Sequence, residues 1–159
     1  ELLPKYSSQD WPEYSLKMLK ANRLFDGPPN VENAIKEALS VLTDPKFSYI
    51  FAKGVLSEVP FSAHLPNLKN KKIYGIIDRL IVGSNNVQII DFKTNSTVPK
   101  TANKIPLGIL RQMSAYKLAI EEIYPGKEVS CYILWTAIKK IDHLEEDLLD
   151  YDNLDASTS

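Results

Sequence analysis

Two aspartates and a lysine are spaced so that one β-hairpin would bring them together. Asp78 and Asp91 lie in adjacent segments rich in strand-forming residues, joined by the polar residues Gly83–Asn86. If these four residues form the hairpin loop, Val82 pairs with Val87, and counting back along both strands places Asp78 opposite Asp91. Residues opposite each other on one face have Cβ atoms about 4.5–5.5 Å apart. Lys93 shares the face of Asp91, because side chains alternate along a strand. The spacing therefore predicts two carboxylates and an ammonium group at one end of the hairpin.

Facing carboxylates are typical of a site for a divalent cation. Two like charges opposite each other in a partly buried sheet repel, and this repulsion lowers stability. A bound cation removes the repulsion, and hard carboxylate oxygens suit Mg²⁺ or Mn²⁺. The alternative, that these charged residues have only a structural role, stays open. The Asp-x-Lys triplet is a weak signal, since it occurs again at Asp44-Pro45-Lys46, and Arg79 could form an ion pair with one of the aspartates. A hairpin register can also slip by one residue.

The segments that must position these side chains alternate between helical and extended patterns. Apolar spacing and end signals predict helices at residues 10–25, from an N-cap at Asn30 to Pro45, at Leu107–Tyr124 and around Leu144–Leu149. Runs of apolar, β-branched and aromatic residues predict strands at Gly54–Ser62, Lys72–Val82, Val87–Lys93 and Glu128–Ala137. This order predicts an α/β fold in which a mixed sheet of about four strands is flanked by helices.

The composition is that of an ordinary globular domain. The chain has 159 residues and a net charge of −1. We expect one domain over residues 1–152, with a helical part at 1–50, a core at 54–150 and a solvated tail at 153–159. Cys131 is the only cysteine, which excludes an internal disulfide or a cysteine-based metal cluster within the chain. No apolar run approaches the roughly 18 residues of a membrane span and no signal peptide is visible, so a reducing cytoplasm is expected.

Four short motifs carry a family resemblance. In sequence order they are Ser57–Phe61, Gly75–Leu80, Asp91–Asn95 and Gln112–Tyr116. Together they resemble the nuclease domain of the RecB/AddA class of PD-(D/E)XK enzymes, and the stretch 55–149 is similar to the C-terminal part of AddA helicase–nucleases. The most AddA-like strings are Leu110–Met113, Ile123–Gly126 and Leu134–Thr136.

The resemblance implies a restriction-endonuclease-like fold and a DNA exonuclease that depends on Mg²⁺, for which Mn²⁺ can substitute. The parent chain would also carry an ATP-dependent helicase motor and associate with an AddB-type partner subunit. It would act in double-strand-break repair by homologous recombination, on single-stranded DNA or unwound duplex ends. The setting would be the cytoplasm and nucleoid of a bacterium, without membrane attachment.

The resemblance also implies roles for individual residues. Asp78 and Asp91 would ligate the metal, with the Phe92 carbonyl and Glu58 as further ligands. Glu58 equally fits an ordinary exposed glutamate on an edge strand. Lys93 would orient or activate the attacking water and offset charge on the scissile phosphate. We expect Lys93 to behave as a surface residue, whose removal leaves stability nearly unchanged.

A helix downstream carries two further members of the catalytic set. Gln112 and Tyr116 lie four residues apart, hence on one helix face, and match the family's Q-x-x-x-Y motif beside the active site. A tyrosine at that spacing is as often a core residue. DNA contacts are expected from Asn95, Lys100, Lys104 and Arg111 and from a basic loop at Lys69, Lys71 and Lys72, although such runs are usually solvated surface. Trp11 and Trp135 are expected in the core.

One feature of the family is missing. The family carries a histidine metal ligand on a helix upstream of these motifs, and neither His64 nor His143 occupies the matching place. Glu1–Pro4 resembles the segment that follows that helix, so we expect a fragment of a longer helicase–nuclease that is weakly active by itself. Two alternatives stay open. One is a stand-alone RecB-family nuclease or junction resolvase, and the other is a degenerate module that binds DNA or a partner without catalysis.

Overall fold

The chain divides into two units, Glu1–Lys53 and Gly54–Ser159, in the computed structural model. The structure describes residues 10–11, 13–15, 17, 28–65, 71–95, 97–149 and 151. Much of the helix predicted at 10–25 and the tail predicted at 153–159 lie outside the described residues. The assignment of residues 1–152 to one domain stays a prediction. None of the described helices is long and apolar enough to span a membrane.

The first unit contains the helix α2 (Pro28–Leu42) and the 3-10 helix η2 (Pro45–Phe51). The predicted N-cap at Asn30 is wrong, because α2 begins earlier, at a proline, and Asn30 lies inside the helix. Proline suits the first helical position, where its missing N–H leaves no hydrogen bond unmade. Asp44 caps η2, since its side chain accepts a hydrogen bond of 3.1 Å from the Lys46 N–H. The second Asp-x-Lys triplet is therefore a helix cap.

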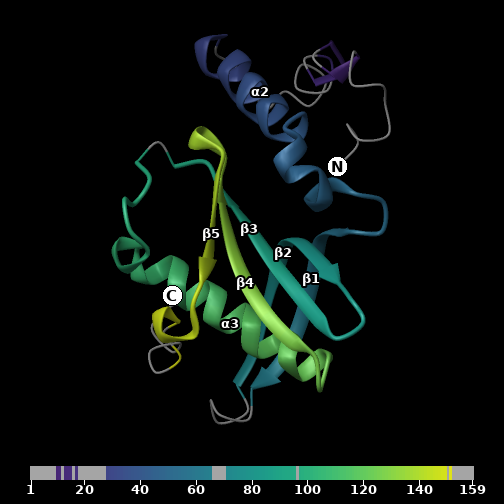
Figure 1. Ribbon diagram of the computed structural model, residues 1–159, viewed down its shortest axis with the longest axis vertical. Coiled ribbons are helices and arrows are strands. Elements are labelled where there is room, and N and C mark those ends of the chain that lie inside the picture. The colour runs from purple at the N-terminus through teal and green to yellow at the C-terminus, as the bar shows by residue number, and fades with distance from the viewer. Residues whose placement is uncertain are drawn as a thin grey trace. The chain divides into compact units, whose positions relative to one another are not determined.

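The second unit is built on a five-stranded sheet in the order β1-β2-β3-β4-β5 (Figure 1). Neighbouring strands are antiparallel except β3 and β4, which run parallel and are connected through the helix α3. A parallel pair needs such a crossover, because both strands start at the same end of the sheet. The predicted α/β fold with a mixed sheet is confirmed. The elements are β1 (Leu56–Leu65), β2 (Lys71–Val82), β3 (Asn86–Lys93), α3 (Leu107–Ile123), β4 (Glu128–Trp135) and β5 (Lys140–Leu144).

The fifth strand corrects both the predicted strand count and the predicted C-terminal helix. β5 pairs antiparallel with β4, and only Glu146–Leu148 form a helical turn, the 3-10 helix η6. The chain reverses through the 3-10 helix η5 (Thr136–Ile138) and Lys139, whose left-handed backbone (φ 52°) makes the tight return. Pairing with β4 satisfies the backbone groups of β5 that a helix would otherwise satisfy internally.

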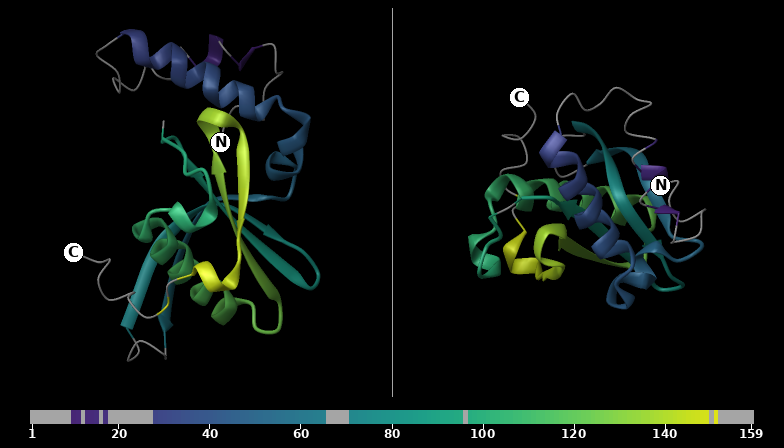
Figure 2. Two further views of the ribbon diagram at one scale, coloured as in Figure 1. Left: turned by 60° about the vertical axis from the view of Figure 1, so that its left-hand side comes forward. Right: turned by 90° about the horizontal axis from the view of Figure 1, so that it is seen from above.

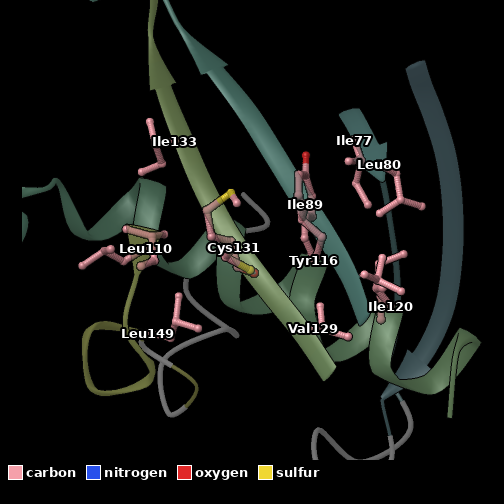
Figure 3. Packing of buried hydrophobic residues seen from close by; sticks show 14 of the residues in the cluster. Ile77, Leu80, Ile89, Leu110, Tyr116, Ile120, Val129, Cys131, Ile133 and Leu149 are labelled. Atoms are coloured by element: carbon pink, nitrogen blue, oxygen red, sulfur yellow. The ribbon is translucent and has the colours of Figure 1, made fainter. Parts of the chain in front are cut away.

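The helix α3 packs on one face of the sheet, where it contacts β1 to β4 (Figure 2). Figure 3 shows Leu110 and Ile120 of α3 in the same cluster as Ile77, Ile89 and Ile133 of the sheet. Removing these apolar side chains from water is the main favourable contribution to folding of this unit. Trp135, at the end of β4, belongs to this cluster as predicted.

Gly75 in β2 makes room for the Tyr116 ring of α3. A Cβ atom added at Gly75 would lie 2.9 Å from Tyr116 Cε1 and 3.0 Å from Phe61 Cε1. The two rings meet edge to face, with centroids 5.3 Å apart and planes at 83°. A glycine inside a strand ordinarily weakens it, so this glycine is explained by the close approach of the two rings.

We expect Gly75→Ala to lower the free energy of unfolding by about 1–3 kcal/mol, the usual cost of overpacking a core. The added methyl group must displace the Tyr116 or Phe61 ring, since the nearest atoms belong to these side chains. Urea unfolding followed by circular dichroism measures the loss. Gly108→Ala is the matched control: no atom lies within 4 Å of its added Cβ, so stability should stay the same or rise. Equal destabilisation of both variants would contradict this packing.

Candidate active site

The β2–β3 hairpin has the predicted register from its loop as far as the pair Arg79–Ile90. Asp78 and Asp91 would be the next pair, but backbone pairing stops there and the two strands separate. At this point the Asp78 side chain connects the two strands, because its Oδ2 accepts a hydrogen bond of 2.6 Å from the Phe92 N–H. This point, where β2 leaves β3, is called the fork below. It brings Asp78 next to the strand segment that carries Asp91.

Side chains beyond the fork alternate between the two faces of the sheet as predicted. Lys93 reaches α3, whereas the Phe92 ring lies on the opposite face, 5.5 Å from the Arg79 guanidinium carbon. Arg79 also donates a hydrogen bond of 2.8 Å from Nη1 to the Asp78 carbonyl. The backbone on the β2 side of the fork is therefore held by Arg79, and the backbone on the β3 side by the Asp78 carboxylate.

Asp91 is a buried carboxylate that lies against the Lys93 ammonium group. Only 4% of the residue is exposed, and this burial raises the pKa of its carboxyl group despite the opposing effect of the Lys93 ammonium. The nearby Asp78 charge adds to the rise in pKa. Asp91 Oδ2 forms an ion pair of 2.6 Å with Lys93 Nζ. Within the described part of the chain, no group other than Lys93 donates to this oxygen.

Lys93 begins a chain of hydrogen bonds that crosses from β3 through α3 to β2. Lys93 Nζ donates to Gln112 Oε1 at 3.0 Å, and Gln112 Nε2 donates to the Tyr116 hydroxyl at 2.9 Å. The Tyr116 hydroxyl donates to the Ile76 carbonyl at 3.0 Å. Burial raises the pKa of Tyr116, which keeps the hydroxyl protonated as this last bond requires. The Q-x-x-x-Y residues thus join the two strands that separate at the fork.

The expectation that Lys93 behaves as a surface residue is wrong. Its side chain is only 19% exposed, because the ammonium group lies against the Asp91 carboxylate and the Gln112 amide. Removing the lysine would leave the Asp91 charge without its compensating partner, and such a change is destabilising. The remaining exposure leaves part of the side chain accessible to a ligand at the fork.

Glu58 lies on β1 at the position across from Asp78. The pairs Ser57–Arg79 and Val59–Ile77 flank this position, yet Glu58 and Asp78 themselves do not pair. Glu58 has a left-handed backbone with φ 49°, a conformation that costs free energy in a non-glycine residue and clusters at functional sites. Its side chain is exposed.

Asp78 and Asp91 have the chemistry of a site for a hard divalent cation. Both offer carboxylate oxygens at the fork, and carboxylate oxygens are the ligands that such a cation prefers. Among the described residues, however, no group of three or more His, Cys, Asp or Glu side chains is close enough to hold a metal. The two aspartates fit as a pair, and Glu58 is not gathered with them into a three-residue cluster.

The residues predicted to contact DNA lie in two places, from the end of β3 into α3 and at the start of β2. Asn95, Lys100 and Lys104 are exposed there, and Arg111 is half-buried on α3. Lys69 lies outside the described residues, and the side chain of Lys71 is likewise not described, whereas Lys72 is exposed in β2.

Neither histidine takes the place of the missing family ligand. His64 is exposed in β1, and His143 Nδ1 lies 3.0 Å from Glu145 Oε1. Neither belongs to a group of three metal-binding side chains in the described ranges.

Two contributors to the site were missed from the sequence. Gly75 admits the Tyr116 ring, and the Thr136 hydroxyl donates a hydrogen bond of 3.2 Å to the Lys93 carbonyl. A glycine within a strand pattern was a usable signal for close packing at Gly75. Thr136 lies in an AddA-like string, but no local pattern predicts its hydrogen bond, because its partner Lys93 lies far away in sequence.

We expect Asp91→Asn to gain thermal stability relative to the wild type as pH rises, in the metal-free protein. The pKa of Asp91 in the folded state lies above the ordinary value of 3.8, so folding favours the protonated form. The stabilising contribution is therefore complete below that value and is lost as pH rises through the raised pKa. Melting curves in EDTA at several pH values should show the melting temperature of the variant rising relative to that of the wild type as pH increases. Asp147→Asn, at an exposed carboxylate, is the control. A stability difference between the variant and the wild type that does not change with pH would contradict this.

The sequence model of the PD-(D/E)XK nuclease superfamily matches residues 12–154. No individual curated protein matches the sequence. The matched range contains the fork, both of its aspartates and the helix that carries Gln112, and the five-stranded mixed sheet is consistent with the restriction-endonuclease-like fold. Proteins of this superfamily are typically nucleases that hydrolyse phosphodiester bonds with divalent metal ions. Because the match covers most of its length, the chain belongs to the PD-(D/E)XK nuclease superfamily.

Proposed function

We propose that the chain is the metal-dependent DNA exonuclease domain of an AddA-type helicase–nuclease that acts in double-strand-break repair by homologous recombination. The observation that carries the nuclease assignment is the fork, where Asp78 lies beside the segment bearing Asp91 and Lys93. Membership of the nuclease superfamily supports the same reaction class. The AddA-like sequence strings support the finer assignment. That assignment includes an ATP-driven motor in the parent chain, an AddB-type partner and a bacterial cytoplasmic location.

Each side chain at the fork has a role in this reaction. Asp78 and Asp91 would hold Mg²⁺ or Mn²⁺, with the Phe92 carbonyl and Glu58 as further ligands. Such a cation would supply an activated water and polarise the phosphate. Lys93 would orient the attacking water and offset negative charge that develops on the phosphate.

Gln112 and Tyr116 position the Lys93 side chain. The Gln112 amide holds the Lys93 ammonium at 3.0 Å, and Tyr116 in turn orients the amide at 2.9 Å. A lysine side chain has several rotatable bonds, so this support limits the positions that the ammonium can take at the phosphate. Asn95, Lys100, Lys104 and Arg111 are the residues that we propose to contact the DNA backbone.

A non-catalytic module that binds DNA or a partner is the second candidate. The observation in its favour is that the described residues contain no cluster of three metal-binding side chains. The two candidates differ in whether the fork takes up a divalent cation and whether DNA is cut.

Metal uptake at the fork is the first test. We expect millimolar Mn²⁺ or Mg²⁺ to raise the melting temperature of the wild type, because a ligand that binds only the folded state stabilises it by about 2.7 kcal/mol at one hundred times its Kd. Asp78→Asn and Asp91→Asn should show a much smaller shift. Asp142→Asn, elsewhere on the sheet, should respond like the wild type. The loss of the free Mn²⁺ electron paramagnetic resonance signal on adding protein gives an independent measure. No shift and no Mn²⁺ uptake by the wild type would exclude the metal site.

Cleavage of end-labelled single-stranded DNA with Mg²⁺ or Mn²⁺ is the second test. We expect Lys93→Met to reduce the cleavage rate by about 10²–10³-fold, the usual effect of removing one group that stabilises charge in the transition state. Lys117→Met is the matched control, because Lys117 is also a mostly buried lysine, paired with Glu121 and Glu146 away from the fork. Both variants should lose stability, but only Lys93→Met should lose cleavage. An equal loss of cleavage in both would assign Lys93 a structural role.

A further inference from the structure

The side chains of β2 stop alternating regularly at the fork. Ile77 and Leu80 both belong to the core cluster that packs against α3 (Figure 3), although residues three apart on a regular strand face opposite sides of the sheet. Arg79 pairs with Ile90, which is fully buried but lies outside that cluster. As the neighbour of Leu80, Arg79 therefore points to the face of the sheet opposite α3, on which the Phe92 ring also lies.

Arg79 is a permanently charged side chain that is only 8% exposed. Arginine is seldom buried to this extent unless the groups around it bind the guanidinium. Its Nη1 donates a hydrogen bond of 2.8 Å to the Asp78 carbonyl, and its guanidinium carbon lies 5.5 Å from the centroid of the Phe92 ring. A planar guanidinium suits both contacts, because its plane can lie over a ring while its N–H groups donate hydrogen bonds.

The two contacts of Arg79 join the same residues that the hydrogen bond at the fork joins. Asp78 Oδ2 accepts the Phe92 N–H at 2.6 Å, and Arg79 connects the Asp78 carbonyl to the Phe92 ring. One hydrogen bond alone would let the two residues turn about it, whereas a second link through different atoms restricts this motion. In the described part of β2 and β3, backbone pairing ends at Arg79 and Ile90. The relative placement of Asp78 and Phe92 therefore depends on these side-chain links.

We propose that Arg79 is a positioning residue of the fork, which fixes the Asp78 carboxylate relative to the Phe92 carbonyl and thereby sets the affinity of the site for a divalent cation. The inference rests on the proposed metal-dependent nuclease function, in which both groups are metal ligands. Mg²⁺ requires nearly ideal octahedral geometry, so ligands that move apart bind it less well. Arg79 would thus support one side of the site from the face opposite Lys93.

The first measurement is made without metal. The exchange rate of the Phe92 amide hydrogen, followed by NMR in EDTA, reports how often its hydrogen bond to Asp78 opens. We expect Arg79→Met to raise this rate about tenfold or more, the effect of losing one hydrogen bond to a charged group. Arg79→Lys keeps the charge but not the planar fork, and should act in the same direction. Exchange at Ile133, in the interior strand β4, reports the stability of the whole sheet and should rise much less.

The second measurement is the affinity for Mn²⁺ alone, from the electron paramagnetic resonance signal of the free ion. We expect both Arg79 variants to raise the Kd about 10–100-fold, the usual effect of removing a residue that orients metal ligands. Phe92→Leu keeps the backbone carbonyl and N–H but removes the ring, and should also raise the Kd. Combined with Arg79→Lys, it should give less than the product of the two fold-changes, because residues in contact do not act independently.

Lys127→Met is the matched control for both measurements. The Lys127 ammonium also donates to a backbone carbonyl, that of Gly83, and lies 5.8 Å from the centroid of the Tyr124 ring. These contacts are of the same kind as those of Arg79, but they lie at the loop end of the β2–β3 hairpin. The variant should leave Phe92 exchange and the Mn²⁺ affinity unchanged.

Two outcomes in the Arg79 variants would overturn the proposal. Phe92 exchange that is unchanged, or that rises no more than exchange at Ile133, would mean that Arg79 does not fix the fork. Faster Phe92 exchange with an unchanged Mn²⁺ affinity would mean that Arg79 stabilises the sheet without serving the ligands. Melting temperatures show whether each variant is folded, and Arg79→Lys and Phe92→Leu keep the test valid if Arg79→Met is not.

Failure of the proposed function gives a different result. A wild type that takes up no Mn²⁺ would exclude the metal site, and with it the role of Arg79 toward a cation. The Phe92 exchange rates would still show whether Arg79 fixes Asp78 relative to Phe92. A wild type that binds Mn²⁺ as well as the Arg79 variants do would instead leave the nuclease proposal intact and exclude only the role of Arg79.

Discussion

The hydrogen bond from the Phe92 N–H to the Asp78 carboxylate is the contact on which the rest of the site depends. It occupies the place where a backbone pair would otherwise continue the β2–β3 ladder. Beyond it, within the described strands, β2 pairs with β1 alone and the end of β3 pairs with β4 alone. The chain of hydrogen bonds from Lys93 through α3 to the Ile76 carbonyl rejoins the separated strands. The same residues that hold the sheet together at this point therefore position the candidate catalytic lysine.

Two features of the fork lower the stability of the folded protein and would favour cation binding. Asp91 is buried with a raised pKa, and Glu58 has a strained backbone across from Asp78. Burying a carboxylate is unfavourable, and the raised pKa shows that the ion pair with Lys93 does not fully offset this cost. Departures from good local structure of this kind are expected where a site is kept ready for a ligand.

The two Asp-x-Lys triplets of the chain show why a short motif does not define a function. In the first unit, Asp44 uses its carboxylate to cap a 3-10 helix through the Lys46 N–H. In the second, Asp91 and Lys93 form a buried ion pair on one face of a central strand. The residue types and spacing are the same, and only the surrounding elements differ. A strand lets residues two apart share a face, whereas a turn directs the carboxylate to its own backbone.

The sequence alone determined the features that depend on neighbouring residues. The hairpin loop set the β2–β3 register, strand alternation put Asp91 and Lys93 on one face, and helix periodicity aligned Gln112 with Tyr116. Tertiary structure alone decided that residues 140–144 form a strand, that Lys93 is mostly buried, and that the Asp78 side chain replaces a ladder hydrogen bond. It also decided which ring Gly75 admits. Local patterns report the spacing of side chains along one element, whereas these features arise from partners that lie far apart in the chain and meet only after folding.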